Sequence, residues 1–191
     1  MIIIYICFTF DSRACLIWGY SGNNNNVIQE GSMMGNIVAL NILEHIPGLP
    51  FFKMANGCDI LLLRDDFYYK HNFYHNRCRI LTAFGPKWIE ISVQIPQYNQ
   101  PINQIKTSSK WKETYHKKVV KSYSTHPYFK SEMPLIDKIL ELHSIKLGDY
   151  NYYFMKQLVK WLHLPFEIKR VTGTQDADIA DNGFKMNEVL A

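Results

Sequence analysis

The feature that most constrains this chain is a short apolar segment that ends abruptly in charge. Residues 60–63, Ile-Leu-Leu-Leu, predict a strand that is buried on both faces of a sheet. Arg64, Asp65 and Asp66 follow at once, without the Gly or Pro that marks a plain surface turn. Because the end of a buried strand fixes the backbone while the next loop supplies polar side chains, we expect a functional site here.

The two adjacent aspartates limit the chemistry of this site. Neighbouring side chains of an extended segment point to opposite sides, so Asp65 and Asp66 cannot form a close pair of carboxylates. One of them is expected to face the site, where it would orient or deprotonate an attacking group. The alternative is structural, since an aspartate here can also cap a turn or pair with Arg77 or Arg79.

Those two arginines alternate in sequence, so an extended segment would place Arg77 and Arg79 on one face. Two adjacent guanidinium groups need anions to balance their charge. The anions are either internal, Asp65 and Asp59, or external, a phosphate or carboxylate held by forked hydrogen bonds. The same stretch holds five aromatic residues, which can pack in the core or stack on a sugar or base: Phe67, Tyr68, Tyr69, Phe73 and Tyr74.

Two histidines and one cysteine in this stretch could in principle bind a metal or act as a nucleophile. His71 and His75 are four residues apart and would share a helical face, which permits metal binding, but this spacing alone is common and we predict no metal site. Cys78 lies between two arginines, whose charge lowers the pKa of a thiol, but we expect a buried structural cysteine rather than a nucleophile.

The residues around this loop are similar to those of a known family. Residues 65–70, Asp-Asp-Phe-Tyr-Tyr-Lys, and residues 76–80, Asn-Arg-Cys-Arg-Ile, resemble the Asp-Asp-Val-Gln-Tyr-x-Lys…Asn-Arg-Asn-Arg-Ile signature of the WbqC-like proteins. Trp88 before a strand ending at Pro96 is similar to another family element. A third similarity consists of Trp111 with Tyr123, Pro127, Tyr128 and Phe129. The resemblance covers roughly residues 37–164.

The resemblance implies a function in bacterial surface-polysaccharide synthesis, including the O-antigen of lipopolysaccharide. It implies a transferase that moves an acyl or aminoacyl group to a sugar amine, with a sugar nucleotide or an acyl or aminoacyl donor as partner and no cofactor. Asp65 or Asp66 would then be the base. The residues that would hold the anionic donor or substrate are Tyr69, Lys70, Asn76, Arg77, Arg79 and Trp111.

The chain departs from the family near its beginning. Family members have a His-Gln-Pro-x-x-x-Pro-Trp element, whereas this chain has Asn41-Ile42-Leu43 and then Pro47-Gly48. The missing His favours a second hypothesis, a non-catalytic binding or scaffold protein of the same pathway. A third hypothesis is an RNA-binding protein, because aromatic residues and lysines are frequent, although no recognised RNA-binding motif is present.

The length and composition predict one compact domain. A chain of 191 residues with 47% hydrophobic residues can bury a full core. The fold class expected is α/β or α+β, with a small mixed sheet, flanking helices and a helical C-terminal half. We predict strands at 37–40, 60–63, 88–95, 102–107 and 166–171, and helices at 51–56, at 110–124, after a Ser131 cap and after an Asp149 cap.

The two ends of the chain have a different composition from the middle. Residues 1–35 are expected to be an extension outside the domain at 36–172, with the natural start at Met33 or Met34, and residues 173–191 a weakly ordered tail. The apolar residues 2–10 number about nine, far below the roughly 20 that span a bilayer. The four cysteines form no paired motif, which favours a reducing compartment and a cytoplasmic protein.

The charge is moderately basic, with a net value of +4. Eight lysines lie between Lys106 and Lys138, against the acidic residues Glu113, Glu132 and Asp137. The plain interpretation is a solvated helix face, and the sharper one is a surface that meets a phosphate. The net positive charge is smaller and less clustered than that of a dedicated nucleic-acid-binding protein, so we expect no nucleic-acid partner.

Overall fold

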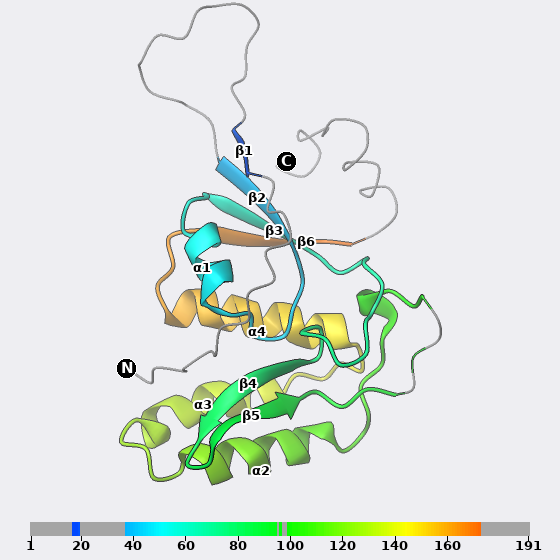
Figure 1. The fold of residues 1–191 in the computed structure, drawn as a ribbon. Helices are drawn as coiled ribbons and strands as arrows, with labels where there is room; N and C mark the ends of the chain where they lie inside the picture. The colour runs from blue at the N-terminus through cyan, green and yellow to red at the C-terminus, as the bar shows by residue number, and fades with distance from the viewer. Residues whose placement is uncertain (1–16, 20–36, 95, 97–98, 173–191) are drawn as a thin grey trace, which may run out of the picture.

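The computed structural model describes residues 17–19, 37–94, 96 and 99–172. The predictions for the rest of the N-terminal extension, for the strand end at Ile95, for part of the turn after Pro96 and for the tail from residue 173 lie outside the described residues. Within the described part, the predicted mixed α/β domain with a helical C-terminal half is confirmed (Figure 1).

The domain begins with a β-α-β unit, as the sequence predicted. Strand β2 (Ile37–Ile42) is followed by helix α1 (Leu49–Ala55) and strand β3 (Ile60–Arg64). The two strands pair in parallel, with Val38 opposite Ile60. Helix α1 begins two residues earlier than the predicted helix at 51–56, because Pro50 is accommodated in its first turn.

Two more strands complete the main sheet. Strand β6 (Glu167–Val171) pairs in parallel with β3, and β1 (Ile17–Gly19) pairs antiparallel with β2, which gives the order β1-β2-β3-β6. Strands β2, β3 and β6 therefore end at the same edge of the sheet. That carboxyl edge is where polar side chains of an α/β fold can gather.

The central strand β3 is buried along its whole length, which explains its unbroken apolar sequence. Leu61 and Leu63 belong to the large core that the helices cover. Ile60 and Leu62 pack on the other face of the sheet in a small apolar cluster with Val38, Leu40 and Val171.

A separate hairpin carries the residues after the loop. Strands β4 (Arg77–Thr82) and β5 (Gly85–Glu90) pair antiparallel, so the predicted turn at Gly85-Pro86 is wrong. The strand predicted at 88–95 is confirmed for residues 88–90, while residues 91–94 continue without a strand. The turn lies two residues earlier, at residues 83–84. The Thr82 hydroxyl stabilises it by donating to the Gly85 carbonyl at 2.7 Å and accepting from the Phe84 amide at 3.2 Å. Gly85 takes a φ of +87°, which glycine adopts at little cost.

The C-terminal half is helical, in helices α2 (Trp111–Tyr123), α3 (Phe129–Leu140) and α4 (Leu147–Trp161). The predicted strand at 102–107 is wrong: it contains a 3-10 helix, η1 (Ile102–Gln104), and then only isolated bridges. Alternating polar residues fit a 3-10 turn as well as a strand when the chain must pass over a neighbouring helix, here α4. Ser131 and Asp149 lie in the first turns of α3 and α4 rather than at their caps.

The layers place the carboxyl edge close to the middle of the molecule. Helix α4 contacts β6, α3 and η1, while α2 packs on the hairpin (Figure 1). Figure 1 shows α4 running between the main sheet and the layer that contains the hairpin and α2. The loop from β3 to β4 thus connects the end of the main sheet to the hairpin across this helix.

Candidate functional site

Asp65, the first residue after β3, forms a buried ion pair. Its carboxylate has no exposed area, and Arg170 of β6 donates to Oδ2 from Nε at 2.6 Å and from Nη2 at 2.5 Å. The Asn103 amide lies 3.5 Å from the other carboxylate oxygen. The internal partner of Asp65 is therefore Arg170, 105 residues away in sequence, and neither Arg77 nor Arg79.

Arg170 also binds a second carboxylate. Its Nη1 donates to Asp149 of α4 at 2.7 Å, and the hydroxyl of Ser144 donates to the other oxygen of Asp149 at 2.6 Å. Burial raises the pKa of Asp149, but the hydrogen bonds from Ser144 and Arg170 outweigh it, and the pKa is lowered overall. The pKa of Arg170 is raised, because its bonds to Asp149 and Asp65 outweigh burial. Asp149 and Arg170 therefore favour their charged forms.

Gly148, at the start of α4, allows this cluster to form. A Cβ atom at this position would lie 2.9 Å from Nη2 of Arg170 and 3.0 Å from Oδ2 of Asp65. The first distance is shorter than real Cβ contacts and the second is tighter than most of them, so a larger residue here would require the Arg170–Asp65 pair to shift. The N-terminal end of a helix also favours negative charge, here Asp65 and Asp149.

Asp66 is held by a different arginine. Arg64, the last residue of β3, donates from Nε to one carboxylate oxygen at 2.9 Å and from Nη2 to the other at 2.5 Å. The side chains of Arg64 and Asp66 are 10% and 13% exposed. The guanidinium of Arg64 lies 4.7 Å from the ring centre of Phe67. Adjacent aspartates thus serve two separate ion pairs, and Asp66 is the one that solvent reaches.

The outer side of the hairpin forms what we call the arginine face: Arg77, Arg79, Trp88 and Tyr74. The guanidinium carbons of Arg77 and Arg79 lie 4.2 and 4.9 Å from the ring centre of Trp88, so the two arginines share one face. The ring of Tyr74 packs against Trp88 at 5.8 Å. Both Nη atoms of Arg77 donate to Asn72, one of them to its side chain at 3.0 Å, whereas its buried Nε has no partner in the described part of the chain.

The other three loop residues that the sequence singled out have different environments. Tyr69 has a buried hydroxyl without a described partner, and burial together with Glu90 raises its pKa to about 12, against a lowering by Arg77. Asn76 is buried and donates to the carbonyl of Ile91 at 3.1 Å. Lys70 is exposed on the surface. Tyr69 is therefore the one of the three that lies between the core and the arginine face.

A buried polar network supports the loop from below. His45 is fully buried, its Nε2 lies 3.1 Å from the Tyr115 hydroxyl, and its backbone amide donates to the carbonyl of Tyr74 at 2.9 Å. The Asn151 amide donates to the carbonyl of His75 at 2.7 Å. Burial lowers the pKa of His45 to about 3, although Asn151 acts in the opposite direction. The histidine is therefore neutral and positions the loop.

Sequence reasoning missed this network and its neighbour Glu44. Leu43 donates its amide to the carbonyl of Arg64 at 2.7 Å, which brings Glu44 to the carboxyl edge beside the beginning of the loop. The Glu44 side chain is partly buried, and burial raises its pKa to about 7. An isolated Glu-His pair has no distinctive spacing, so no sequence signal marks it.

The four remaining candidates are Trp111, Cys78, His71 and His75. Trp111 is 2% exposed, and its ring packs edge-on against Tyr115 and Tyr150 in the core. Cys78 is also buried, and burial raises the pKa of its thiol to about 12, which keeps it protonated. His71 and His75 lie in a stretch of turns rather than a helix, and the Nδ1 of His75 accepts the Lys70 amide at 3.1 Å.

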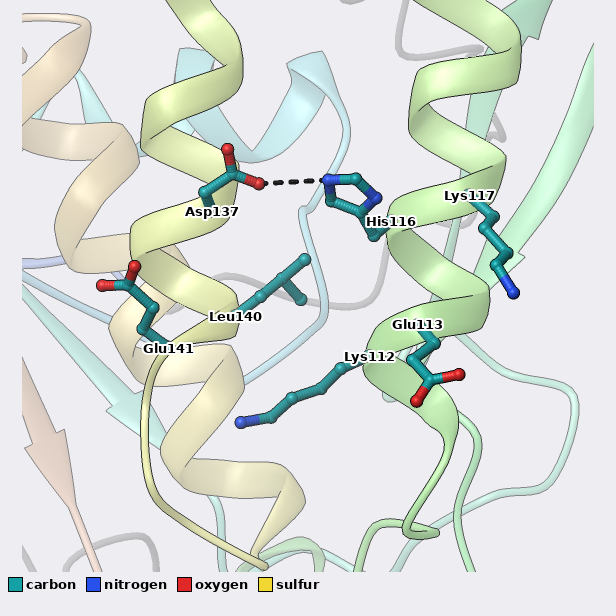
Figure 2. Close-up of a pocket in the computed structure, with 7 residues that line it drawn as sticks. All are labelled: Lys112, Glu113, His116, Lys117, Asp137, Leu140 and Glu141. Carbon is teal, nitrogen blue, oxygen red and sulfur yellow. Dashed lines mark ion pairs between the residues drawn. The ribbon is translucent and has the colours of Figure 1, made fainter.

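A hollow between α2 and α3 contains none of the predicted site residues (Figure 2). It is an open groove of about 610 Å³. His116 of α2 faces Asp137 of α3 across it, with 3.3 Å between Nε2 and Oδ1, and their side chains are 45% and 47% exposed. The groove is lined by Lys112, Glu113, His116, Lys117, Asp137, Leu140 and Glu141.

Comparison with known proteins identifies the family. The sequence model of the WbqC-like protein family matches residues 44–186 of this chain. This chain belongs to the WbqC-like protein family. No curated protein and no solved structure matches the chain. The matched region begins at Glu44 and contains the loop, the arginine face and all of α2, α3 and α4.

In this WbqC-like chain, the predicted acidic and arginine residues lie at two places that the loop after β3 connects. Asp65 and Asp66 lie at the carboxyl edge, and Arg77 and Arg79 lie on the arginine face at the far end of the loop. None of the described helices of this WbqC-like protein is long and apolar enough to cross a membrane.

Proposed function

We propose that this WbqC-like protein is a cytoplasmic transferase that adds an acyl or aminoacyl group to the amine of a nucleotide-linked sugar, in the synthesis of a bacterial surface polysaccharide such as O-antigen. The observation that supports it is the loop that joins two rigid acidic ion pairs at the carboxyl edge to a face with two stacked arginines. Acidic groups suit proton transfer from an amine, and paired guanidinium groups suit a diphosphate.

The arginine face would bind the diphosphate of the nucleotide. The Trp88 ring beneath the two guanidinium groups restricts their motion, so little entropy is lost when they bind phosphate oxygens. The N–H groups of Arg77 would exchange Asn72 for the phosphate. The buried hydroxyl of Tyr69, near Arg77, has no partner in the described part of the chain and would donate to the same ligand. Lys70, on the exposed part of the loop, would add positive charge.

Asp66 would act as the base in the transfer. The amine nitrogen attacks the carbonyl carbon of an acyl thioester, a C–N bond forms and the C–S bond breaks. The nitrogen loses a proton to Asp66, and the leaving thiolate takes up a proton. Asp66 is favoured over Asp65 because it is 13% exposed whereas Asp65 has no exposed area. Arg64 fixes its orientation, and Asp65 would hold the loop through Arg170.

The test is a transfer assay read by mass spectrometry. The protein is incubated with a UDP-linked amino sugar and a panel of acyl and aminoacyl thioesters, and the amide product is sought. Asp66→Asn should reduce the rate about 10²-fold or more, the usual range for a general base. His116→Ala, in the groove, is the control and should leave the rate unchanged. Full activity of Asp66→Asn would contradict the role of Asp66.

A non-catalytic binding protein of the same pathway is the second candidate. It is favoured by the pairing of both aspartates with arginines. Such a protein would bind the nucleotide sugar through the arginine face and give no amide product with any thioester. The transfer assay separates the two candidates.

A further inference from the structure

The turn of the β4–β5 hairpin carries an apolar side chain that the protein leaves almost uncovered. Phe84 is 87% exposed, the highest value among the large apolar residues of the described chain, and Leu81 beside the turn is 41% exposed. The backbone of the turn is well held, because the Thr82 hydroxyl bonds to the Phe84 amide and to the Gly85 carbonyl. A fixed turn therefore keeps an apolar ring in water.

Aromatic side chains from the corner between α2 and α3 extend this apolar turn. The Tyr123 hydroxyl, in the last turn of α2, faces the backbone of Leu81, and α2 contacts both strands of the hairpin. The His126 ring lies 6.4 Å from the Tyr123 ring and 6.2 Å from that of the exposed Tyr128. The hairpin turn lies beside this end of α2 (Figure 1). We call the following residues the hairpin-tip surface: Leu81, Phe84, Tyr123, His126 and Tyr128.

The two segments that form the hairpin-tip surface contain lysines and no acidic residue. Residues 80–89 and residues 114–131 have no Asp or Glu. Their five lysines outnumber the net charge of the whole chain, +4, so the remainder of the chain has a net charge of −1. The excess positive charge of the protein thus belongs to these two segments. The lysines are Lys87, Lys117, Lys118, Lys121 and Lys130, and all but Lys118 are exposed.

We propose that the hairpin-tip surface docks this protein on an anionic membrane surface, with the Phe84 ring inserted among the lipid headgroups and the lysines near the lipid phosphates. This docking goes beyond the proposed function and does not depend on it. An exposed apolar ring gains free energy when it leaves water for the boundary between headgroups and acyl chains. A tyrosine such as Tyr128 suits the same boundary, because its ring is apolar and its hydroxyl is polar. Each lysine near an anionic surface adds electrostatic attraction.

An anionic membrane fits these residues better than either RNA or a second copy of this chain. RNA-binding surfaces use aromatic rings as platforms for stacked bases, and an exposed aliphatic residue such as Leu81 adds nothing to stacking. In a symmetric dimer the same surface of each copy meets the other, so two sets of five lysines would face each other and repel. Anionic lipids complement both the apolar turn and the charge.

Docking through the turn has a consequence for the arginine face. Side chains alternate along β4, so Leu81 lies on the same side of the hairpin as Arg79, and the register places Pro86 and Trp88 opposite them. The arginine face therefore continues toward the apolar turn. A ligand bound to the two arginines would lie near the membrane surface when the protein is docked.

The first experiment is sedimentation of the whole chain with vesicles, either of phosphatidylcholine alone or of phosphatidylcholine mixed with phosphatidylglycerol. The wild-type protein should bind the mixed vesicles and should bind them less at high salt. Phe84→Ser should weaken this binding about tenfold, the factor expected when one apolar ring no longer inserts. Ile145→Ser is the matched control, because Ile145 is an exposed apolar residue outside the two segments, and it should keep wild-type binding.

The second experiment tests the charge in the same assay. Lys121→Ala/Lys130→Ala should weaken binding to the mixed vesicles about tenfold or more, since each lysine near an anionic surface contributes attraction. Lys156→Ala/Lys160→Ala removes the same charge from exposed positions of α4 and should bind like the wild-type protein. Equal losses in the two double variants would mean that net charge alone directs binding, which contradicts a defined docking surface.

Other outcomes would overturn the proposal outright. Absence of binding to the mixed vesicles, or binding that Phe84→Ser leaves intact, would remove the membrane role of the turn. A dimer in sedimentation velocity that Phe84→Ser dissociates, without vesicle binding, would assign the surface to a second copy of this chain. Binding of single-stranded oligouridine that is lost in Lys121→Ala/Lys130→Ala, without vesicle binding, would assign it to RNA.

Discussion

The carboxyl edge and the groove between α2 and α3 both contain a basic side chain bound to a carboxylate, but the two pairs differ in burial. At the edge, Arg170 and Asp65 have side chains that are 22% and 0% exposed. In the groove, His116 and Asp137 are 45% and 47% exposed. Water screens an exposed pair and solvates either partner when the other is lost, whereas a buried charge left alone has no substitute. The buried pair at the carboxyl edge therefore stabilises the fold, whereas the exposed pair in the groove contributes little to stability.

The largest effect expected from this difference comes from Arg170→Met. The substitution leaves Asp65 buried without its guanidinium, which should lower the free energy of unfolding by about 3 kcal/mol or more. Urea unfolding measures the change. The double variant Asp65→Asn/Arg170→Met removes both charges and should recover part of the loss. A loss in the single variant no larger than that of an exposed pair would erase the distinction between the two regions.

A comparable effect should follow from acidification, through His45. Burial lowers its pKa in the folded protein to about 3, below the 6.5 of an exposed histidine, so the unfolded chain binds one more proton between these values. Stability from His45 is complete above pH 6.5 and is lost as the pH falls, by about 1.4 kcal/mol per pH unit. His45→Gln should remove that share of the slope between pH 6 and pH 4 in urea unfolding. An unchanged slope would mean that His45 titrates normally.

A smaller effect is expected from Gly148→Ala. The added Cβ would lie 2.9 Å from Arg170 Nη2 and 3.0 Å from Asp65 Oδ2, so the ion pair must shift. We expect a loss of about 2 kcal/mol in thermal or urea unfolding, as for other overpacked sites. Gly57→Ala is the control, because its Cβ would meet only the Met54 carbonyl, at an ordinary 3.5 Å. Equal losses in the two variants would show that the space at Gly148 is not limiting.

The smallest effect is expected in the groove. Asp137→Ala removes the exposed partner of His116 and should change the free energy of unfolding by less than about 1 kcal/mol. This change should be smaller still at high salt, because salt screens exposed charges. The measurement is urea unfolding at two salt concentrations. A loss as large as that of Arg170→Met would place a buried, structural pair in the groove.

The parts of the fold that were predicted from the sequence depend on local periodicity. The apolar residues of β3 predicted a buried strand, and the helix predicted at 110–124 is α2, whose buried residues Trp111, Tyr115 and Val119 recur at helical spacing. The alternation of Arg77 and Arg79 placed both on one face for the same reason. In each case neighbouring residues alone determine which side of the element is buried.

The features that were missed depend on partners far away in sequence. The pairing of Asp65 with Arg170 arises only because β6 lies beside β3, and the pKa values of Glu44 and His45 depend on burial by several elements. Trp111 matched a family pattern, but its environment is the core. A sequence pattern names candidate side chains, and packing decides which of them meet one another and which meet solvent.

The central claim is that ligand binding belongs to the arginine face and not to the lysines of α2. The most direct test is calorimetric binding of UDP-glucosamine to two variants that each lose two positive charges, Arg77→Ala/Arg79→Ala and Lys117→Ala/Lys121→Ala. We predict at least about a tenfold loss of affinity in the arginine variant, since charged hydrogen bonds to phosphate are removed, and no change in the lysine variant. Equal losses, or a loss only in the lysine variant, would contradict it.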